Sequence, residues 1–255
     1  MSNFDTTATA ILQARMGSSR LPGKVLLPLG GKPTVQCVFE RILHCKRIGR
    51  IIVATTTKQE DNVIEELFRS LNVEVFRGSS EDPLDRYYNA ANYFGVEHIV
   101  RVMADCPLVD PTIVDEVIEQ YFKGDFDFCS LVGNFPTGLD TTVFSFNAIK
   151  LASKLATKKS EREHVTPFIT NNKQRFRIGR YEKFKDLFHH RWVMDQPDDY
   201  KFIREIYKNF KNSQKIFTSE DILKLLHERP YLMKINSHIV RDQGYLQSLN
   251  ADKKA

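Results

Sequence analysis

Residues 9–24 read TAILQARMGSSRLPGK, a short apolar run followed directly by a loop rich in positive charge. The run predicts a buried first strand, and the loop carries three cations, two hydroxyls and two glycines. Glycines let successive backbone N–H groups turn toward an anion, while arginine and lysine neutralise phosphate charge. We therefore expect a phosphate-binding loop here; the alternative is a solvated basic turn.

This loop departs from two common nucleotide-binding patterns. Gly17 and Gly23 enclose five residues, and Lys24 is followed by Val25 instead of Ser or Thr, so the loop is not a Walker A sequence. It also lacks the G-x-G-x-x-G of dinucleotide-binding folds. The residues predict phosphate binding without identifying the nucleotide.

Apolar runs alternate with amphipathic segments through residue 130. Strands are predicted at 51–54, 73–76 and 99–103, and helices at 33–43 and 59–71. A third helix has Asp82 as its cap, Pro83 in its first turn and Gly95 at its end. This order predicts an α/β, Rossmann-like fold, a mainly parallel sheet with helices on both faces. Ligands of such folds bind beyond the carboxyl ends of the strands, which directs attention to the loops after residues 13, 54, 76 and 103.

The second half is less regular, and we treat residues 1–255 as a single domain. A segment with glycine and proline, a strand and three helices are predicted at 134–140, 142–146, 148–156, 198–210 and 219–227. The Lys253-Lys254 tail is predicted to be disordered.

Bulk properties favour a cytoplasmic protein that binds a small anionic substrate. No signal peptide and no apolar stretch of membrane-spanning length is seen, so no membrane insertion is expected. The net charge of +5 is modest beside the basic faces of nucleic-acid binders, and no nucleic-acid partner is expected. The four cysteines form no C-x-x-C pair and are expected to be reduced, apolar filler.

The run 11–33, ILQARMGSSRLPGKVLLPLGGKP, resembles the opening of the spore-coat polysaccharide biosynthesis protein F family. That family is related to the cytidylyltransferases that activate 3-deoxy-manno-octulosonate and N-acylneuraminate. The resemblance spans about residues 8 to 210, with further matching segments at 77–78, 82–88, 104–108, 138–140, 162–167 and 192–195.

The resemblance implies that the first loop holds CTP, in agreement with the reading of its residues. Arg15, Arg20 and Lys24 would grip the phosphates and act in catalysis. The backbone and hydroxyl donors implied beside them are Gly17, Ser18 and Ser19. Arg77, through its backbone, and Asp85 would approach the nucleotide, although Asp85 is equally typical of a helix N-terminal network.

The resemblance also implies a Mg²⁺ site made by Asp105 and Asp195. Two carboxylates together with triphosphate oxygens suit magnesium. Two structural alternatives remain open: Asp105 as a turn former before Cys106, and Asp195 as a helix cap before Asp198.

The implied reaction transfers CMP from CTP to a sugar and releases pyrophosphate, in surface polysaccharide or glycoconjugate biosynthesis. His164 and Arg162 would bind the sugar, expected to be a 2-keto-3-deoxy sugar acid, although a charged helix surface explains them almost as well. The portion 132–195 would contain the sugar site and dimerisation contacts, giving a homodimer.

A D-x-D pattern at Asp125-Phe126-Asp127 matches the metal site of many glycosyltransferases. It precedes the apolar run 128–130, which puts it at the sheet edge opposite the ligand. A glycosyltransferase using a nucleotide sugar and a non-catalytic nucleotide-binding protein are therefore the alternatives to cytidylyl transfer.

Overall fold

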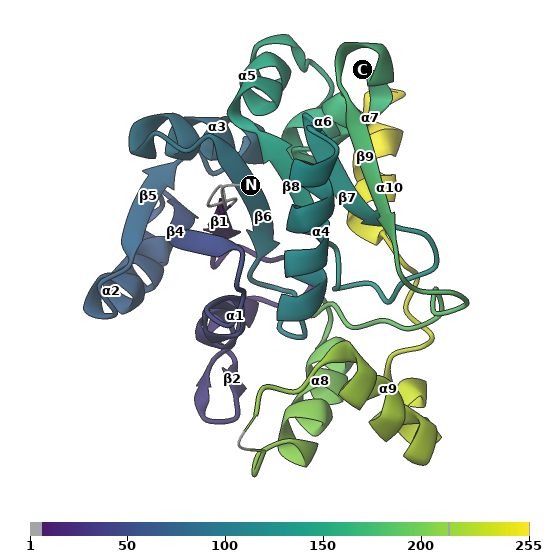
Figure 1. Ribbon diagram of the computed structural model, residues 1–255. Coiled ribbons are helices and arrows are strands. Elements are labelled where there is room, and N and C mark those ends of the chain that lie inside the picture. The colour runs from purple at the N-terminus through teal and green to yellow at the C-terminus, as the bar shows by residue number, and fades with distance from the viewer. Residues whose placement is uncertain (1–6, 214, 255) are drawn as a thin grey trace.

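A seven-stranded sheet forms the centre of the protein, whose structure is a computed structural model describing residues 7–213 and 215–254 (Figure 1). The strands lie in the order β5-β4-β1-β6-β8-β7-β9. Their bounds are β1 Ala8–Gln13, β4 Ile48–Thr56, β5 Glu74–Gly78, β6 His98–Met103, β7 Phe128–Val132, β8 Thr142–Ser145 and β9 Ile178–Glu182. β8 runs antiparallel to β6 and β7, and the other pairs are parallel, which confirms the predicted mainly parallel sheet.

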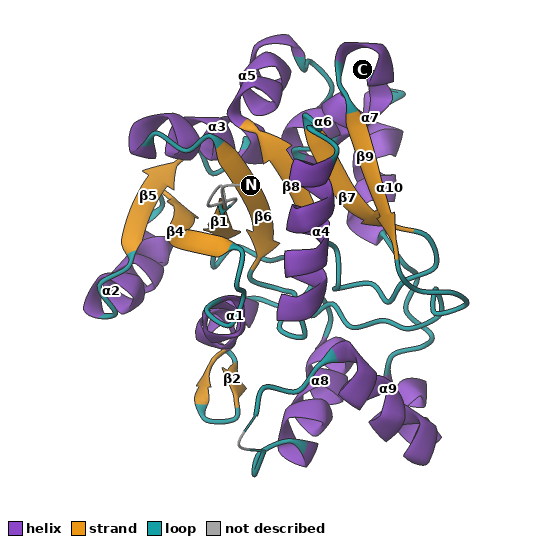
Figure 2. Cartoon of the chain, in the orientation of Figure 1, coloured by secondary structure: helices purple, strands orange, loops and turns teal. Residues whose placement is uncertain are grey.

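Helices cover both faces of this sheet (Figure 2). One face packs against α1 Thr34–Ile42, α2 Asn62–Ser70 and α4 Pro111–Lys123. The other packs against α3 Pro83–Phe94, α5 Phe146–Leu155 and α7 Pro167–Asn171, with α6 Lys159–His164 beside α3. The helices α8 Pro197–Asn209, α9 Ser219–Glu228 and α10 Gln243–Asp252 complete the chain, and a small hairpin pairs β2 Pro28–Leu29 with β3 Lys32–Pro33.

The third helix follows the predicted punctuation. The Asp82 side chain accepts a hydrogen bond of 3.0 Å from the backbone N–H of Asp85, and Pro83 occupies the first helical position. Gly95 ends the helix in the left-handed conformation, at φ 64°. The short loop between β5 and this helix contacts the first loop of the chain, because the Ser80 carbonyl accepts a hydrogen bond from Arg15.

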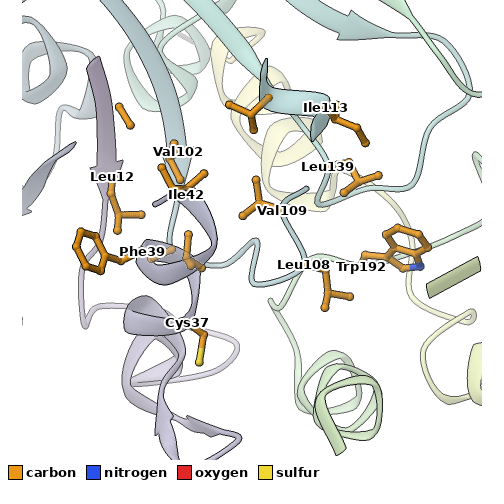
Figure 3. Packing of buried hydrophobic residues seen from close by; sticks show 14 of the residues in the cluster. Leu12, Cys37, Phe39, Ile42, Val102, Leu108, Val109, Ile113, Leu139 and Trp192 are labelled. Carbon is orange, nitrogen blue, oxygen red and sulfur yellow. The ribbon is translucent and has the colours of Figure 1, made fainter. Parts of the chain in front are cut away.

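The first large core lies between the sheet and α1, α2, α4, α8 and α9 (Figure 3). Trp192 is fully buried in it and lies near Leu139. The chain around Gly138 approaches the backbone of Trp192 so closely that a Cβ on Gly138, at φ 103°, would lie 2.6 Å from the Trp192 carbonyl carbon. Glycine is therefore needed at this crossing, which fixes the segment leading to Asp195.

The C-terminal part differs from the sequence prediction. The tail predicted to be disordered follows α10 directly, and the backbone N–H groups of Lys253 and Lys254 donate to Leu249 and Ala251 of that helix. Apolar and polar residues are poorly separated around α10, so the sequence gave no periodic signal for this helix. The helix is held in place by contacts with α6. In the described parts of the chain, no helix is both long and apolar enough to cross a membrane.

Candidate nucleotide site

A cavity of about 360 Å³ opens beyond the carboxyl ends of β1 and β6, at the edge that the fold rule indicates. The first loop forms one wall, through Arg15, Gly17, Ser18, Ser19, Arg20 and Lys24. The opposite wall contains Asp105, His164 and Asp195 together with residues of α10. The structure thus brings nine of the residues singled out from the sequence to one cavity.

The first loop is held in place by a buried carboxylate. Asp61 accepts a 2.6 Å hydrogen bond from the backbone N–H of Met16 and a second from the hydroxyl of Thr56. Gly23 adopts φ 66° where the loop closes on itself, with its N–H donating to the Met16 carbonyl. Glycine and an anchoring carboxylate therefore give the loop a defined shape before any ligand binds.

Lys24 lies between the two carboxylates of the implied metal site. Its Nζ is 2.6 Å from Asp105 Oδ2 and 3.1 Å from Asp195 Oδ1. Arg20 donates to the other oxygen of Asp195 through both Nε, at 2.9 Å, and Nη2. Two cations and two anions thus form one network at the floor of the cavity.

The ion pairs of this network shift the pKa values of Lys24 and Asp195. Burial alone would lower the pKa of Lys24, but Asp105 and Asp195 outweigh it and the net shift is upward. Burial alone would raise the pKa of Asp195, but Lys24 and Arg20 outweigh it and the net shift is downward. Both Lys24 and Asp195 are therefore charged throughout the neutral pH range.

Asp195 is free to face the cavity because a neighbour takes the helix-capping role. The N-cap of α8 is Gln196, and the buried Asp199 accepts hydrogen bonds from the backbone N–H groups of Asp195 and Gln196 at 3.1 and 2.9 Å. Asp199 is itself held by Arg191 at 2.8 Å. The alternative in which Asp195 caps α8 is thus wrong, because Asp199 accepts the hydrogen bonds from the backbone N–H groups at the start of that helix.

The two carboxylates fit a magnesium ion that is also bound by substrate phosphates. No group of three or more His, Cys, Asp or Glu side chains converges as a metal site in the described residues. Asp105 and Asp195 nevertheless converge on one point, because both lie within hydrogen-bonding distance of the Lys24 ammonium. Magnesium is usually held by one or two carboxylates with water and phosphates as the remaining ligands.

His164 lies at the end of α6 and faces α10. Its Nε2 is 3.1 Å from the Ser248 hydroxyl, and that hydroxyl donates to Glu163. The Tyr245 ring meets the imidazole edge to face. Burial lowers the pKa of His164, so the ring is neutral at neutral pH. The turn after it is unusual, because the buried Val165 adopts φ 72°.

Three other predicted residues do not join this cavity. Arg77 donates to the Thr56 and Lys58 carbonyls and pairs with Glu65, so its side chain is committed to the loop before α2. Arg162 pairs with Asp82 and donates to two backbone carbonyls, which ties α6 to the start of α3. Asp85 lies in the first turn of α3, outside the cavity lining. The helix-network alternative accounts for Arg162.

The D-x-D pattern lies where its position before a strand predicts. Asp125 and Asp127 precede β7 at its amino end and both pair with Arg177. Because the cavity lies at the carboxyl ends of β1 and β6, these carboxylates are on the opposite edge of the sheet. The structure gives no support to a nucleotide-sugar site there.

Several residues that line the cavity were not predicted from the sequence. Gln13 ends β1, and its buried Oε1 has no hydrogen-bond partner among the described residues. Arg101 lies in the middle of β6, and Ser248 comes from α10. A charge inside the apolar run 99–103 was a usable signal for Arg101, whereas nothing local marks Ser248.

A second cavity of about 440 Å³ adjoins the first. The two share Arg20, Arg101, Met103, Asp105, His164, Asp195 and Gly244. Its remaining wall comes from the segments around Asp140, Thr166, Arg191 and Asp242. A ligand in one cavity would therefore reach a ligand in the other beside Asp105 and Asp195.

Comparisons with known proteins agree with this geometry. Residues 9–228 match the cytidylyltransferase family. An uncharacterized protein of Methanocaldococcus jannaschii is 40% identical over 237 residues, which are 92% of this chain and 96% of that one. The spore coat polysaccharide biosynthesis protein SpsF of Bacillus subtilis is 31% identical over 228 residues, 86% of this chain and 94% of its own.

The solved structure of a cytidylyltransferase from Leptospira borgpetersenii serovar Hardjo-bovis superposes with a TM-score of 0.82. It is 29% identical and covers 89% of this chain and 97% of its own. The similarity therefore extends over most of both chains.

Proposed function

Because the chain belongs to the cytidylyltransferase family, we propose that it transfers CMP from CTP to a 2-keto-3-deoxy sugar acid and releases pyrophosphate, in surface polysaccharide or glycoconjugate biosynthesis. The family and its fold make the chain a nucleotidyltransferase. The observation that carries the proposal is the cluster of Arg20, Lys24, Asp105 and Asp195 at the floor of a cavity walled by a phosphate-binding loop.

The chemistry needs a sugar hydroxyl oxygen to attack the α-phosphorus of CTP. A new P–O bond forms, the bond from the α-phosphorus to the bridging oxygen breaks, pyrophosphate leaves and the hydroxyl proton passes to water. The protein takes little part in making or breaking bonds, so it accelerates the reaction mainly by positioning the substrates and neutralising charge. Lys24 and Arg20 supply positive charge, and the loop from Arg15 to Ser19 supplies N–H and hydroxyl donors.

Asp105 and Asp195 are the residues that would hold Mg²⁺. The ion, when bound, neutralises charge on phosphate oxygens. The cation between the two carboxylates in the ligand-free chain is the Lys24 ammonium. That ammonium belongs to a flexible four-carbon side chain, which suits it to contact phosphate as well as carboxylate.

The acceptor belongs on the side of His164. This imidazole lines both cavities and is held neutral; its Nε2 donates to the Ser248 hydroxyl, which leaves Nδ1 to accept a hydrogen bond. Such a group suits sugar hydroxyls. Support for an acid as the acceptor comes from the resemblance to the sugar-acid enzymes and from the arginines that line the second cavity.

The test is pyrophosphate release with Mg²⁺, each of the four nucleoside triphosphates, and sugar acids beside neutral sugars. We expect release with CTP and a 2-keto-3-deoxy sugar acid, and CMP attached to that acid in the product. Release with a different nucleotide, or with neutral sugars alone, contradicts the proposal at the nucleotide or at the acceptor respectively.

A homodimer is part of the proposal. It rests on the resemblance to enzymes whose second halves carry dimer contacts. Light scattering at micromolar concentration should give twice the chain mass, and a mass of one chain would count against it.

A further inference from the structure

Arg101 is an arginine on a central strand, and its side chain lines both cavities. It lies on β6, opposite Ile11 of β1 and Thr142 of β8. Within the residues that the structure describes, its side chain makes no hydrogen bond or ion pair, and its Nε is buried without a partner. Burying part of a guanidinium without a hydrogen-bonded counter-charge is costly, so an anionic ligand at this position would stabilise the group.

The other arginines that line the second cavity are engaged by carboxylates. Arg20 pairs with Asp195, and Arg191 pairs with Asp199. Their charges are already neutralised, whereas the charge of Arg101 acts at longer range and depresses the protonation of His164. Arg101 is therefore the guanidinium best placed to meet an incoming anion in the space that both cavities share.

The wall facing this arginine comes from the C-terminal segment. Residues 242–245 line the second cavity, and they lie beyond residue 228, where the family match ends. The segment is anchored on α6, because Asp252 accepts from the Ser160 N–H at 3.1 Å and Ser248 bonds with Glu163 and His164. The cavity is thus closed by an element outside the family match.

The chemistry of this cavity suits a hydroxylated carboxylic acid. Asp140 and Asp242 offer acceptor oxygens to sugar hydroxyls, while His164, whose Nε2 bonds with the Ser248 hydroxyl, offers Nδ1 as an acceptor. Arg101 offers a planar fork of N–H groups, which matches the two oxygens of a carboxylate. The cavity of about 440 Å³ is of the size usual for small-molecule sites.

We propose that Arg101 binds the carboxylate of the acceptor acid in the second cavity, behind a wall formed by residues 242–245. This inference rests on the proposed cytidylyl transfer and names the residue that selects acids over neutral sugars. The same guanidinium chemistry could serve a CTP phosphate, so the experiment must separate the two anions.

The first arm measures thermal stabilisation and needs no turnover. Wild type, Arg101→Gln and Arg180→Gln are compared, the last as a matched loss of an exposed strand arginine on β9. The probes are CTP alone, and 3-deoxy-manno-octulosonate or N-acetylneuraminate with and without CTP. We expect CTP to raise the Tm of all three proteins equally, and an acid to raise the Tm of wild type and Arg180→Gln but not of Arg101→Gln.

The ligand-free proteins give a check on folding. Because Arg101 has no hydrogen bond or ion pair to lose among the residues that the structure describes, Arg101→Gln should melt at or above the wild-type temperature. Arg101→Lys, which keeps the charge but loses the fork, should recover part of the acid-induced shift.

The second arm is kinetic. Arg101→Gln should raise KM for the acid about 10- to 100-fold and leave KM for CTP within about threefold, as expected for losing charge-assisted hydrogen bonds to one ligand. The variant should also lose the preference for the acid over its carboxamide.

Three outcomes overturn the inference. If CTP no longer raises the Tm of Arg101→Gln, Arg101 binds phosphate. If the acids raise the Tm of Arg101→Gln as much as that of wild type, Arg101 does not bind the acid. No response of wild type to any acid, with pyrophosphate still released from CTP and a neutral sugar, would remove the carboxylate subsite and leave nucleotidyl transfer standing.

Discussion

Asp105 and Asp195 share one cation, because Lys24 Nζ lies 2.6 Å from the first carboxylate and 3.1 Å from the second. Asp105 follows β6 and Asp195 precedes α8, so the relationship exists only in the folded chain. It joins the phosphate-binding loop to both carboxylates.

Replacing Asp105 by Asn keeps the shape of the side chain and removes its charge. We expect pyrophosphate release to fall at least about 100-fold, as when one electrostatic group of a transition-state site is lost. Asp127→Asn, at the opposite sheet edge, should stay within about twofold of wild type. Full activity of Asp105→Asn with a dead Asp127→Asn would transfer the metal site to the D-x-D pattern.

Lys24→Met leaves two carboxylates facing each other without their shared cation. We expect the free energy of unfolding to fall by about 2 kcal/mol, less than for a fully buried pair because the carboxylates keep solvent contact. Millimolar Mg²⁺ should restore more Tm in this variant than in wild type, since a divalent ion can take the vacated position. Equal Mg²⁺ responses in calorimetry would mean that the two carboxylates do not converge on a cation.

Gly138→Ala tests the crossing that fixes the segment before Asp195. The added methyl group meets the Trp192 backbone, at a left-handed φ that alanine disfavours, so we expect a loss of about 2 kcal/mol or more. Gly31→Ala is the matched control, because Gly31 also has a positive φ but open space around its Cβ position. Equal destabilisation of the two variants in urea unfolding would show that the close approach contributes nothing.

Asp61→Asn tests the anchor of the first loop. The amide can still accept from Met16 but no longer as a charged acceptor, so the loop should loosen. We expect KM for CTP to rise about tenfold while a kcat measured at saturating CTP changes less. A fall in kcat alone, with unchanged KM, would argue against a role in holding the triphosphate loop.

The neutral His164 predicts a dependence of stability on pH. Burial lowers its folded-state pKa below the usual value near 6.5, so the unfolded chain binds the proton more tightly. Its contribution is therefore complete above about pH 6.5 and is lost as the pH falls below that value. Wild type should lose more Tm than His164→Gln between pH 7.5 and 5.5, and parallel curves would contradict the assignment.

The sequence by itself determined the order of strands and helices and the type of sheet they form. Alternating apolar runs and amphipathic segments set the mainly parallel sheet, because strand and helix periods differ and are visible locally. Asp82, Pro83 and Gly95 gave the ends of α3, since capping depends on neighbouring residues. The glycine and cation content of the first loop likewise indicated phosphate chemistry before the fold was known.

The tertiary structure decided which side chains share a site. It placed Arg77 and Arg162 in structural ion pairs and gave Arg101 no partner within residues 7–213 and 215–254, although all three are arginines in or beside predicted elements. It also folded the C-terminal helix over the cavity. Hydrogen bonds and ion pairs between distant segments depend on where the elements pack, and no local pattern of residues records that packing.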